Sequence, residues 1–250
     1  MPLTGSSQAQ ARYERLLESI YHGLIVSCHA ENEEPFHTPE FVASFARAAE
    51  LGGAVALRVE GLENIGAIRR HTKLPVIGYI EGEYEDGSPL ITPDFADVEK
   101  LIQAKTDIIA IDSTARKRKN GLDGLEFFQE VKNKYQVLLW SDVSVFREGV
   151  KAAEYGADFV ATTLSGYTAN TNMKDHRKPD YSLIRELSLS LTIPVIAEGR
   201  IWTPNDASCA IQEGAYAVVV GTAISRPRVV TQMFVTALQN TSQMLTSYQQ

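Results

Sequence analysis

The chain has 250 residues, of which 44% are hydrophobic and 22% charged, as in ordinary soluble globular proteins. Its net charge of −7 argues against a dedicated nucleic-acid-binding protein, because a phosphate backbone requires clustered positive charge. Two cysteines, Cys28 and Cys209, are too few for a disulfide framework or a thiolate zinc site. The longest apolar runs fall far short of the ~20 residues that span a bilayer, and the polar segment 1–10 lacks the apolar core of a signal peptide. We therefore expect a cytoplasmic protein without membrane contact.

Short apolar segments alternate with longer segments of helical character along the whole chain. The predicted strands are 23–27, 54–58, 75–80, 107–112, 137–142, 159–163, 194–197 and 217–221. Most are continuous apolar blocks, which favours parallel strands covered on both faces. Helices are predicted to open at the Thr-Pro pairs at 38–39, 92–93 and 203–204.

Three helical segments end in a Gly-Ala phrase that leads into a strand, at 52–54, 156–157 and 214–215. Eight strands with helical crossovers predict a single-domain (β/α)8 barrel over 23–238. We expect an N-terminal tail and leading helix over 1–22 and a polar C-terminal tail over 239–250. A doubly wound open sheet is the alternative, but no G-x-G-x-x-G turn follows the first predicted strand.

The active face of such a barrel lies where its strands end, so these positions carry the functional candidates. They include His29 after the first strand, Glu81 after the third, and Asp112 and Asp142 at the ends of the fourth and fifth. Histidines do not pair there at metal spacing, and no lysine ends a strand, so neither a metal site nor a Schiff-base enzyme is expected. Asp112 could equally be a strand-end residue that caps the following turn.

The last two strand ends have the composition of a phosphate site. Glu198-Gly199-Arg200 follows the seventh strand, and the segment 221–227, which contains Gly221 and Arg226, follows the eighth. Small residues let backbone N–H groups approach an anion, and a short helix near Ala223 would direct its positive end toward it. The alternative is that these glycines only form tight turns. A basic run, 116–118, could also approach the phosphate or be a solvated charge run.

Four phrases resemble the N-acetylmannosamine-6-phosphate 2-epimerase family: GLIVSC at 23–28, TTLSGYT at 162–168, PVIAEGR at 194–200 and VVGTAISRP at 219–227. The resemblance implies a barrel of the ribulose-phosphate-binding type, often a homodimer, that acts on a phosphorylated N-acyl hexosamine in amino sugar and sialic acid catabolism. It implies interconversion of N-acetylmannosamine 6-phosphate and N-acetylglucosamine 6-phosphate by proton transfer at C2, with neither a metal nor an organic cofactor.

The family's site residues carry over by position. Glu198 matches its catalytic glutamate. Arg58, Asp142, Gly199, Arg200, Gly221 and Arg226 are the predicted substrate-binding residues. The family's catalytic lysine ends strand three, and Glu81 occupies that position here; His29 stands where many members carry glutamine. Three interpretations of Glu81 remain open: a substitute catalytic base, a pocket for another sugar phosphate, or a sugar-phosphate binder that has lost its chemistry.

Overall fold

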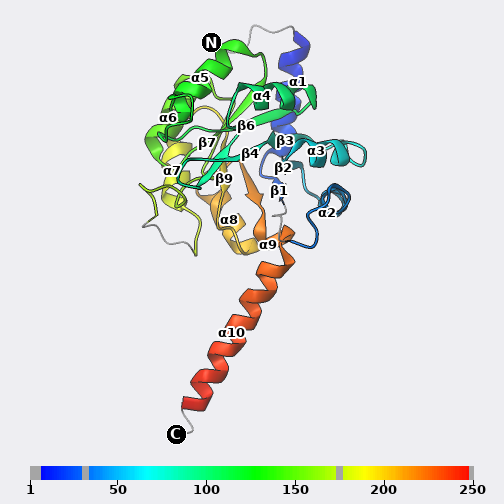
Figure 1. Ribbon diagram of the computed structural model, residues 1–250, viewed down its shortest axis with the longest axis vertical. Helices are drawn as coiled ribbons and strands as arrows, with labels where there is room; N and C mark the ends of the chain where they lie inside the picture. The colour runs from blue at the N-terminus through cyan, green and yellow to red at the C-terminus, as the bar shows by residue number, and fades with distance from the viewer. Residues whose placement is uncertain (1–6, 30–33, 173–176, 248–250) are drawn as a thin grey trace.

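The protein is described here from a computed structural model that covers residues 7–29, 34–172 and 177–247. Eight parallel strands close into a barrel in the order β1-β10-β9-β8-β7-β6-β3-β2, which confirms the predicted (β/α)8 fold (Figure 1). They are β1 Leu24–Cys28, β2 Ala56–Glu60, β3 Val76–Tyr79, β6 Ile108–Asp112, β7 Leu138–Asp142, β8 Phe159–Ala161, β9 Val195–Glu198 and β10 Ala217–Val220. The bounds of all eight lie within two residues of the prediction.

Helices surround this barrel in the alternation that parallel strands require. They are α1 Ser7–Ile20, α2 Pro39–Leu51, α3 Leu62–Arg69, α4 Phe95–Gln103, α5 Gly124–Lys134, α6 Phe146–Glu154, α7 Tyr181–Ser190, α8 Pro204–Gln212, α9 Thr222–Ser225 and α10 Pro227–Ser247. Thr38 and Thr203 are the N-caps of α2 and α8, as predicted. The helix expected to open at Thr92-Pro93 instead begins at Phe95, because Asp94 caps it and accepts a hydrogen bond from the Asp97 amide.

Alternating side chains of each strand divide the core into two layers. Residues such as Ile25, Ile77, Trp140 and Ile196 fill the barrel interior, whereas their neighbours pack outward against the helices. Ile20 of α1 joins the interior cluster and is buried, so this leading helix closes the amino-terminal end of the barrel. The opposite end, where the strands finish, is left for the functional site.

Two features depart from the sequence-based expectation. A two-stranded antiparallel hairpin, β4 Glu81–Glu83 and β5 Pro89–Ile91, follows β3 in a segment where no strand was predicted. Helix α10 continues through Ser247, beyond the boundary at 239 where a polar tail was expected, because no Pro or Gly interrupts 228–247. Figure 1 shows α10 extending away from the barrel. No helix within the described residues is both long and apolar enough to cross a membrane.

Candidate active site

The carboxyl ends of the strands direct polar side chains into the barrel mouth. The alternation that places Ala56, Trp140 and Ile196 inside places the residues two positions later, Arg58, Asp142 and Glu198, inside as well. Arg58 and Asp142 are almost completely buried, and the Glu198 side chain is only 12% exposed. Three predicted site residues from strands far apart in the sequence therefore meet at one point.

Arg58 is held in a fixed orientation by two carboxylates. Its Nη1 and Nη2 donate to Oδ1 and Oδ2 of Asp142 at 3.2 and 2.7 Å, and its Nε lies 3.3 Å from Glu198 Oε1. The Trp140 indole also donates to Asp142 Oδ1, at 2.9 Å. Such a bidentate pair is rigid as well as strong, so the guanidinium is positioned before any ligand binds.

Glu198 is buried, and the Thr163 hydroxyl lies between its carboxyl group and that of Asp142. Burial raises the pKa of Glu198 to about 7, with Asp142 adding to the rise while Arg58 and the Thr163 hydroxyl oppose it. The Thr163 hydroxyl lies 2.5 Å from Asp142 Oδ1 and 3.1 Å from Glu198 Oε2. A carboxyl with this pKa can both accept and release a proton near neutral pH, as acid–base catalysis requires.

The predicted residue Glu81 faces the same cavity from β4 and is more exposed than Glu198, at 43% of its side chain. Its Oε2 lies 3.7 Å from His29 Nε2. The other imidazole nitrogen, Nδ1, lies 3.4 Å from the Tyr79 hydroxyl, and the Tyr79 ring stacks against the Arg58 guanidinium at 4.8 Å. Burial raises the pKa of Tyr79, so this hydroxyl remains neutral.

A cavity of about 430 Å³ connects these groups with the predicted phosphate end, where Gly199, Arg200, Gly221 and Arg226 contribute to its lining. Arg200 is 8% exposed, and its Nε and Nη1 have no hydrogen-bond partner among the described residues. Gly166 has a φ of +86°, which favours glycine, and a Cβ there would lie 1.9 Å from Arg200 Nη1, so the guanidinium packs closely against this glycine. Buried cationic donors without a partner indicate that an anionic group belongs there.

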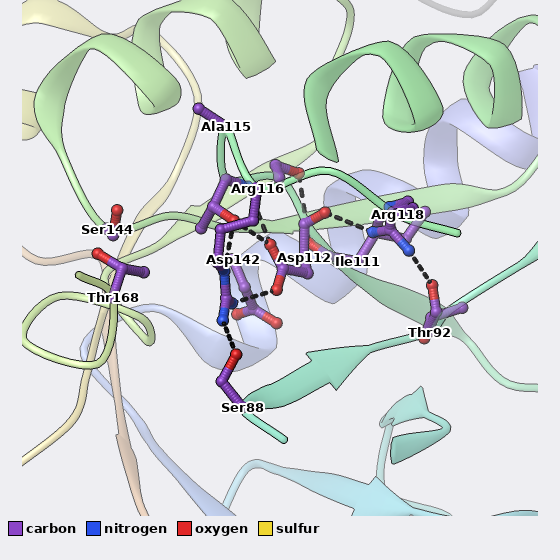
Figure 2. Close-up of polar contacts among 12 residues, drawn as sticks. Ser88, Thr92, Ile111, Asp112, Ala115, Arg116, Arg118, Asp142, Ser144 and Thr168 are labelled. Atoms are coloured by element: carbon purple, nitrogen blue, oxygen red, sulfur yellow. Dashed lines mark hydrogen bonds and ion pairs between the residues drawn. The ribbon is translucent and has the colours of Figure 1, made fainter. Parts of the chain in front are cut away.

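The two arginines of the basic run 116–118, which follows β6, bind neighbouring loops and the end of β6. Arg116 Nη2 contacts Asp112 Oδ2 at 2.6 Å, and Arg116 Nη1 donates to the Ser88 hydroxyl of the β4–β5 connection at 3.2 Å (Figure 2). Arg118 is buried and donates to the carbonyl groups of Thr92 and Asp112. Neither arginine lines the cavity, and Arg118 is buried, so these two arginines follow neither alternative: they do not reach the predicted phosphate end and they do not form a solvated charge run.

Asp112 follows the capping alternative, because its carboxylate accepts hydrogen bonds from the amide and hydroxyl of Thr114. Cys28 points outward into the helix-facing core and is 1% exposed, and burial raises its pKa to about 12. Within the described residues, no group of three or more His, Cys, Asp or Glu could hold a metal ion.

Sequence reasoning missed three residues of the site: Tyr79, Gly166 and the partner role of Thr163. The strand alternation that begins at Ile77 places Tyr79 inside, so this residue could have been found from the pattern alone. The close approach of Arg200 to Gly166 depends on a side chain from another strand end, which no local pattern reveals.

A closed parallel barrel with a carboxyl of near-neutral pKa, a fixed guanidinium and buried cationic donors at one end of the cavity is suited to acid–base chemistry on an anionic substrate. Comparison with known proteins identifies the family. The family model described as "Putative N-acetylmannosamine-6-phosphate epimerase" matches residues 42–240. The chain belongs to the N-acetylmannosamine-6-phosphate epimerase family.

Named relatives cover nearly the whole chain. A protein from Caldanaerobacter subterraneus subsp. tengcongensis, named "Putative N-acetylmannosamine-6-phosphate 2-epimerase", is 47% identical over 90% of this chain and 94% of its own length. One of the same name from Clostridioides difficile is 43% identical over 90% and 99%. The solved N-acetylmannosamine-6-phosphate 2-epimerase from Clostridium perfringens superposes with a TM-score of 0.82 at 40% identity, over 89% of this chain and 96% of that one.

Proposed function

We propose that this protein interconverts N-acetylmannosamine 6-phosphate and N-acetylglucosamine 6-phosphate by moving a proton at C2. The observation that carries this proposal is Glu198, a buried carboxyl with a pKa of about 7, in contact with Arg58 at the barrel mouth. The names of the relatives supply the substrate pair, and the geometry supplies a group that can exchange a proton near neutral pH.

Epimerisation needs proton transfer on both faces of one carbon. In the open-chain aldehyde, the C2–H bond breaks, its electron pair shifts into a C1–C2 double bond, and negative charge develops on O1. A proton then returns to the opposite face of C2 as the carbonyl group re-forms, so no oxidant or reductant is consumed. We assign Glu198 to one face of C2. We assign the other face to a group on the part of the cavity wall that carries Glu81, because Glu198 and Glu81 line the same cavity.

The phosphate group is proposed to bind where Gly199, Arg200, Gly221 and Arg226 line the cavity. Glycines allow close approach of backbone N–H groups, and the Arg200 guanidinium offers donors that the described residues leave without a partner. Arg58 and Asp142 are proposed to contact the sugar, since their fixed pair forms part of the barrel mouth beside Glu198.

Deuterium incorporation at C2 tests this function directly. With either sugar phosphate in D₂O, the purified protein should introduce deuterium at C2 and produce the other epimer. The Glu198→Gln variant should lose ~10²-fold or more in rate while still binding the ligand, because the substitution preserves shape and removes the carboxyl that accepts and releases a proton. Saturable binding without exchange at any protein concentration would instead indicate a sugar-phosphate binder.

We also propose that the protein is a homodimer assembled through α10. Phe234, Leu238 and Leu245 lie four and seven positions apart, so they share one helix face, and they are 70%, 69% and 61% exposed. A second copy of the same chain offers the complementary apolar surface, since an isologous interface pairs a patch with itself.

A further inference from the structure

The cavity wall formed by β1, β3 and β4 carries titratable side chains in series. His29 follows β1, Tyr79 ends β3, and Glu81 begins β4. The imidazole lies between the other two, with Nδ1 3.4 Å from the Tyr79 hydroxyl and Nε2 3.7 Å from Glu81 Oε2. His29 continues the inward alternation of Ile25 and Ser27, so it lines the cavity that Glu198 also lines.

We propose that His29, held by Glu81, is the catalytic residue that serves the second face of the substrate carbon, with Glu198 serving the first. This inference rests on the proposed epimerase function and makes the role of Glu81 specific: Glu81 is the positioning residue, and it acts through the imidazole.

The proton balance of a reversible reaction favours an imidazole over a lone carboxylate. One group must remove the C2 proton while the other delivers one, and the roles exchange in the reverse direction. A water-exposed glutamate is normally ionised at neutral pH, so it can accept a proton but has none to deliver. An imidazole does both near neutral pH, and a neighbouring carboxylate stabilises its protonated form.

The geometry identifies which nitrogen transfers the proton. The 3.4 Å separation between Nδ1 and the Tyr79 hydroxyl is a long hydrogen bond, and the 3.7 Å separation between Nε2 and Glu81 Oε2 is an ion-pair distance when the imidazole is protonated. We assign the transfer to Nε2, because Tyr79 orients the ring through Nδ1 and the Glu81 carboxylate stabilises the proton on Nε2. Tyr79 fixes the ring from the other side and is itself stacked on Arg58.

In the active enzyme, one of the two groups His29 and Glu198 is then protonated and the other is not. Protonation of both groups at low pH removes the base, and deprotonation of both at high pH removes the acid. The same singly protonated pair serves both directions, so each direction should show a bell-shaped pH profile with the same limbs. Among the described residues, Tyr79 and Glu81 are titratable groups that face His29, and Glu60 interacts in turn with Glu81.

The experiment compares His29→Gln, Glu81→Gln, the double variant and His71→Gln, a control at an exposed histidine just after α3, away from the cavity. Deuterium exchange at C2 gives kcat, KM and their pH dependence. His29→Gln should lower kcat by ~10²-fold with KM nearly unchanged, and its residual activity should lose one limb of the bell. Glu81→Gln should lower kcat by roughly tenfold, and the double variant should match His29→Gln, because Glu81 acts through His29.

Several outcomes overturn the proposal. His29→Gln with wild-type kcat and an unchanged bell would remove His29 from the reaction, and additive losses in the double variant would show that Glu81 acts on its own. Calorimetric binding of N-acetylglucosamine 6-phosphate verifies that each variant is folded, and His29→Asn replaces His29→Gln if the latter does not bind. A wild-type protein without exchange would refute the proposed function itself, whereas an active wild type with an active His29→Gln refutes only this inference.

Discussion

Glu198 places a carboxyl where burial opposes its ionisation, and this has a consequence for stability. Because burial raises its pKa in the folded state to about 7, the native protein binds more protons than the unfolded chain between the ordinary carboxyl pKa and pH 7. The contribution of this group to the free energy of unfolding therefore falls as pH rises through that window.

We predict that Glu198→Gln stabilises the fold at pH 8 by about 3 kcal/mol relative to wild type, with little difference at pH 4. The physical reason is that glutamine has no ionised form to be penalised by burial. Urea unfolding of both proteins at the two pH values measures the effect. A difference that is the same at both pH values would contradict the assigned pKa shift.

Two arginines, Arg200 and Arg226, line the end of the cavity where we propose that the phosphate binds. Arg200→Ala and Arg226→Ala should each weaken binding of the phosphorylated sugar by ~1.5–3 kcal/mol, the size of a charge-assisted hydrogen bond. Binding of unphosphorylated N-acetylmannosamine should be weak in wild type and unchanged in both variants. Calorimetry with the two ligands measures this, and equal affinities for them in wild type would refute the placement of the phosphate.

Among the elements, the β4–β5 hairpin places Glu81 at the barrel mouth, and Arg116 contacts the connection between its two strands. This arginine connects the Asp112 carboxylate at the end of β6 with Ser88 (Figure 2). Its guanidinium stacks on the Tyr84 ring at 4.2 Å. Arg118 adds a second connection through the carbonyl groups of Thr92 and Pro93. The hairpin is therefore held by the loop after β6 as well as by its own ladder.

We predict that Arg116→Met speeds amide hydrogen exchange of Tyr84 and Gly87 by roughly tenfold and lowers global stability by ~1–3 kcal/mol, because Asp112 loses its charged partner. Lys117→Met is the matched control, since Lys117 makes only exposed ion pairs with Asp123 and Glu126. Equal exchange rates in both variants would show that the hairpin does not depend on Arg116.

In the molecule as a whole, α10 is the helix that does not pack along the barrel (Figure 1). Figure 1 shows it leaving the barrel body, and its large apolar residues are exposed. An apolar face of this length in water favours association with a second copy of the chain.

We predict that Phe234→Glu with Leu238→Glu converts a dimer into a monomer while the barrel stays folded, because charges on the shared face cannot be buried without partners. Thr236→Glu is the control, since its position lies on the other side of the helix. Light scattering after size-exclusion chromatography measures the mass. A wild-type monomer at all concentrations would refute the proposed homodimer.

The barrel could be predicted in detail because its signals are local. Buried parallel strands read as continuous apolar blocks, and the glycine of each Gly-Ala phrase has a positive φ: +95° at Gly53, +88° at Gly156 and +99° at Gly214. The β4–β5 hairpin was missed because Glu81–Glu83 is three exposed or half-buried polar residues without apolar alternation. The contacts that Arg116 and Arg118 make with this hairpin and with Thr92 come from the loop after β6, which no local pattern connects to it.

The fold class, the strand ends and the residue types that face the mouth followed from the sequence alone, because strand periodicity and helix caps depend on neighbouring residues. Which of those residues act together depends on closure of the barrel. Arg58 meets Asp142 across 84 positions, and His29 meets Tyr79 across 50. Closing the barrel brings these groups within a few ångströms and removes water from Glu198, and that burial, which no local pattern contains, sets its pKa near neutrality.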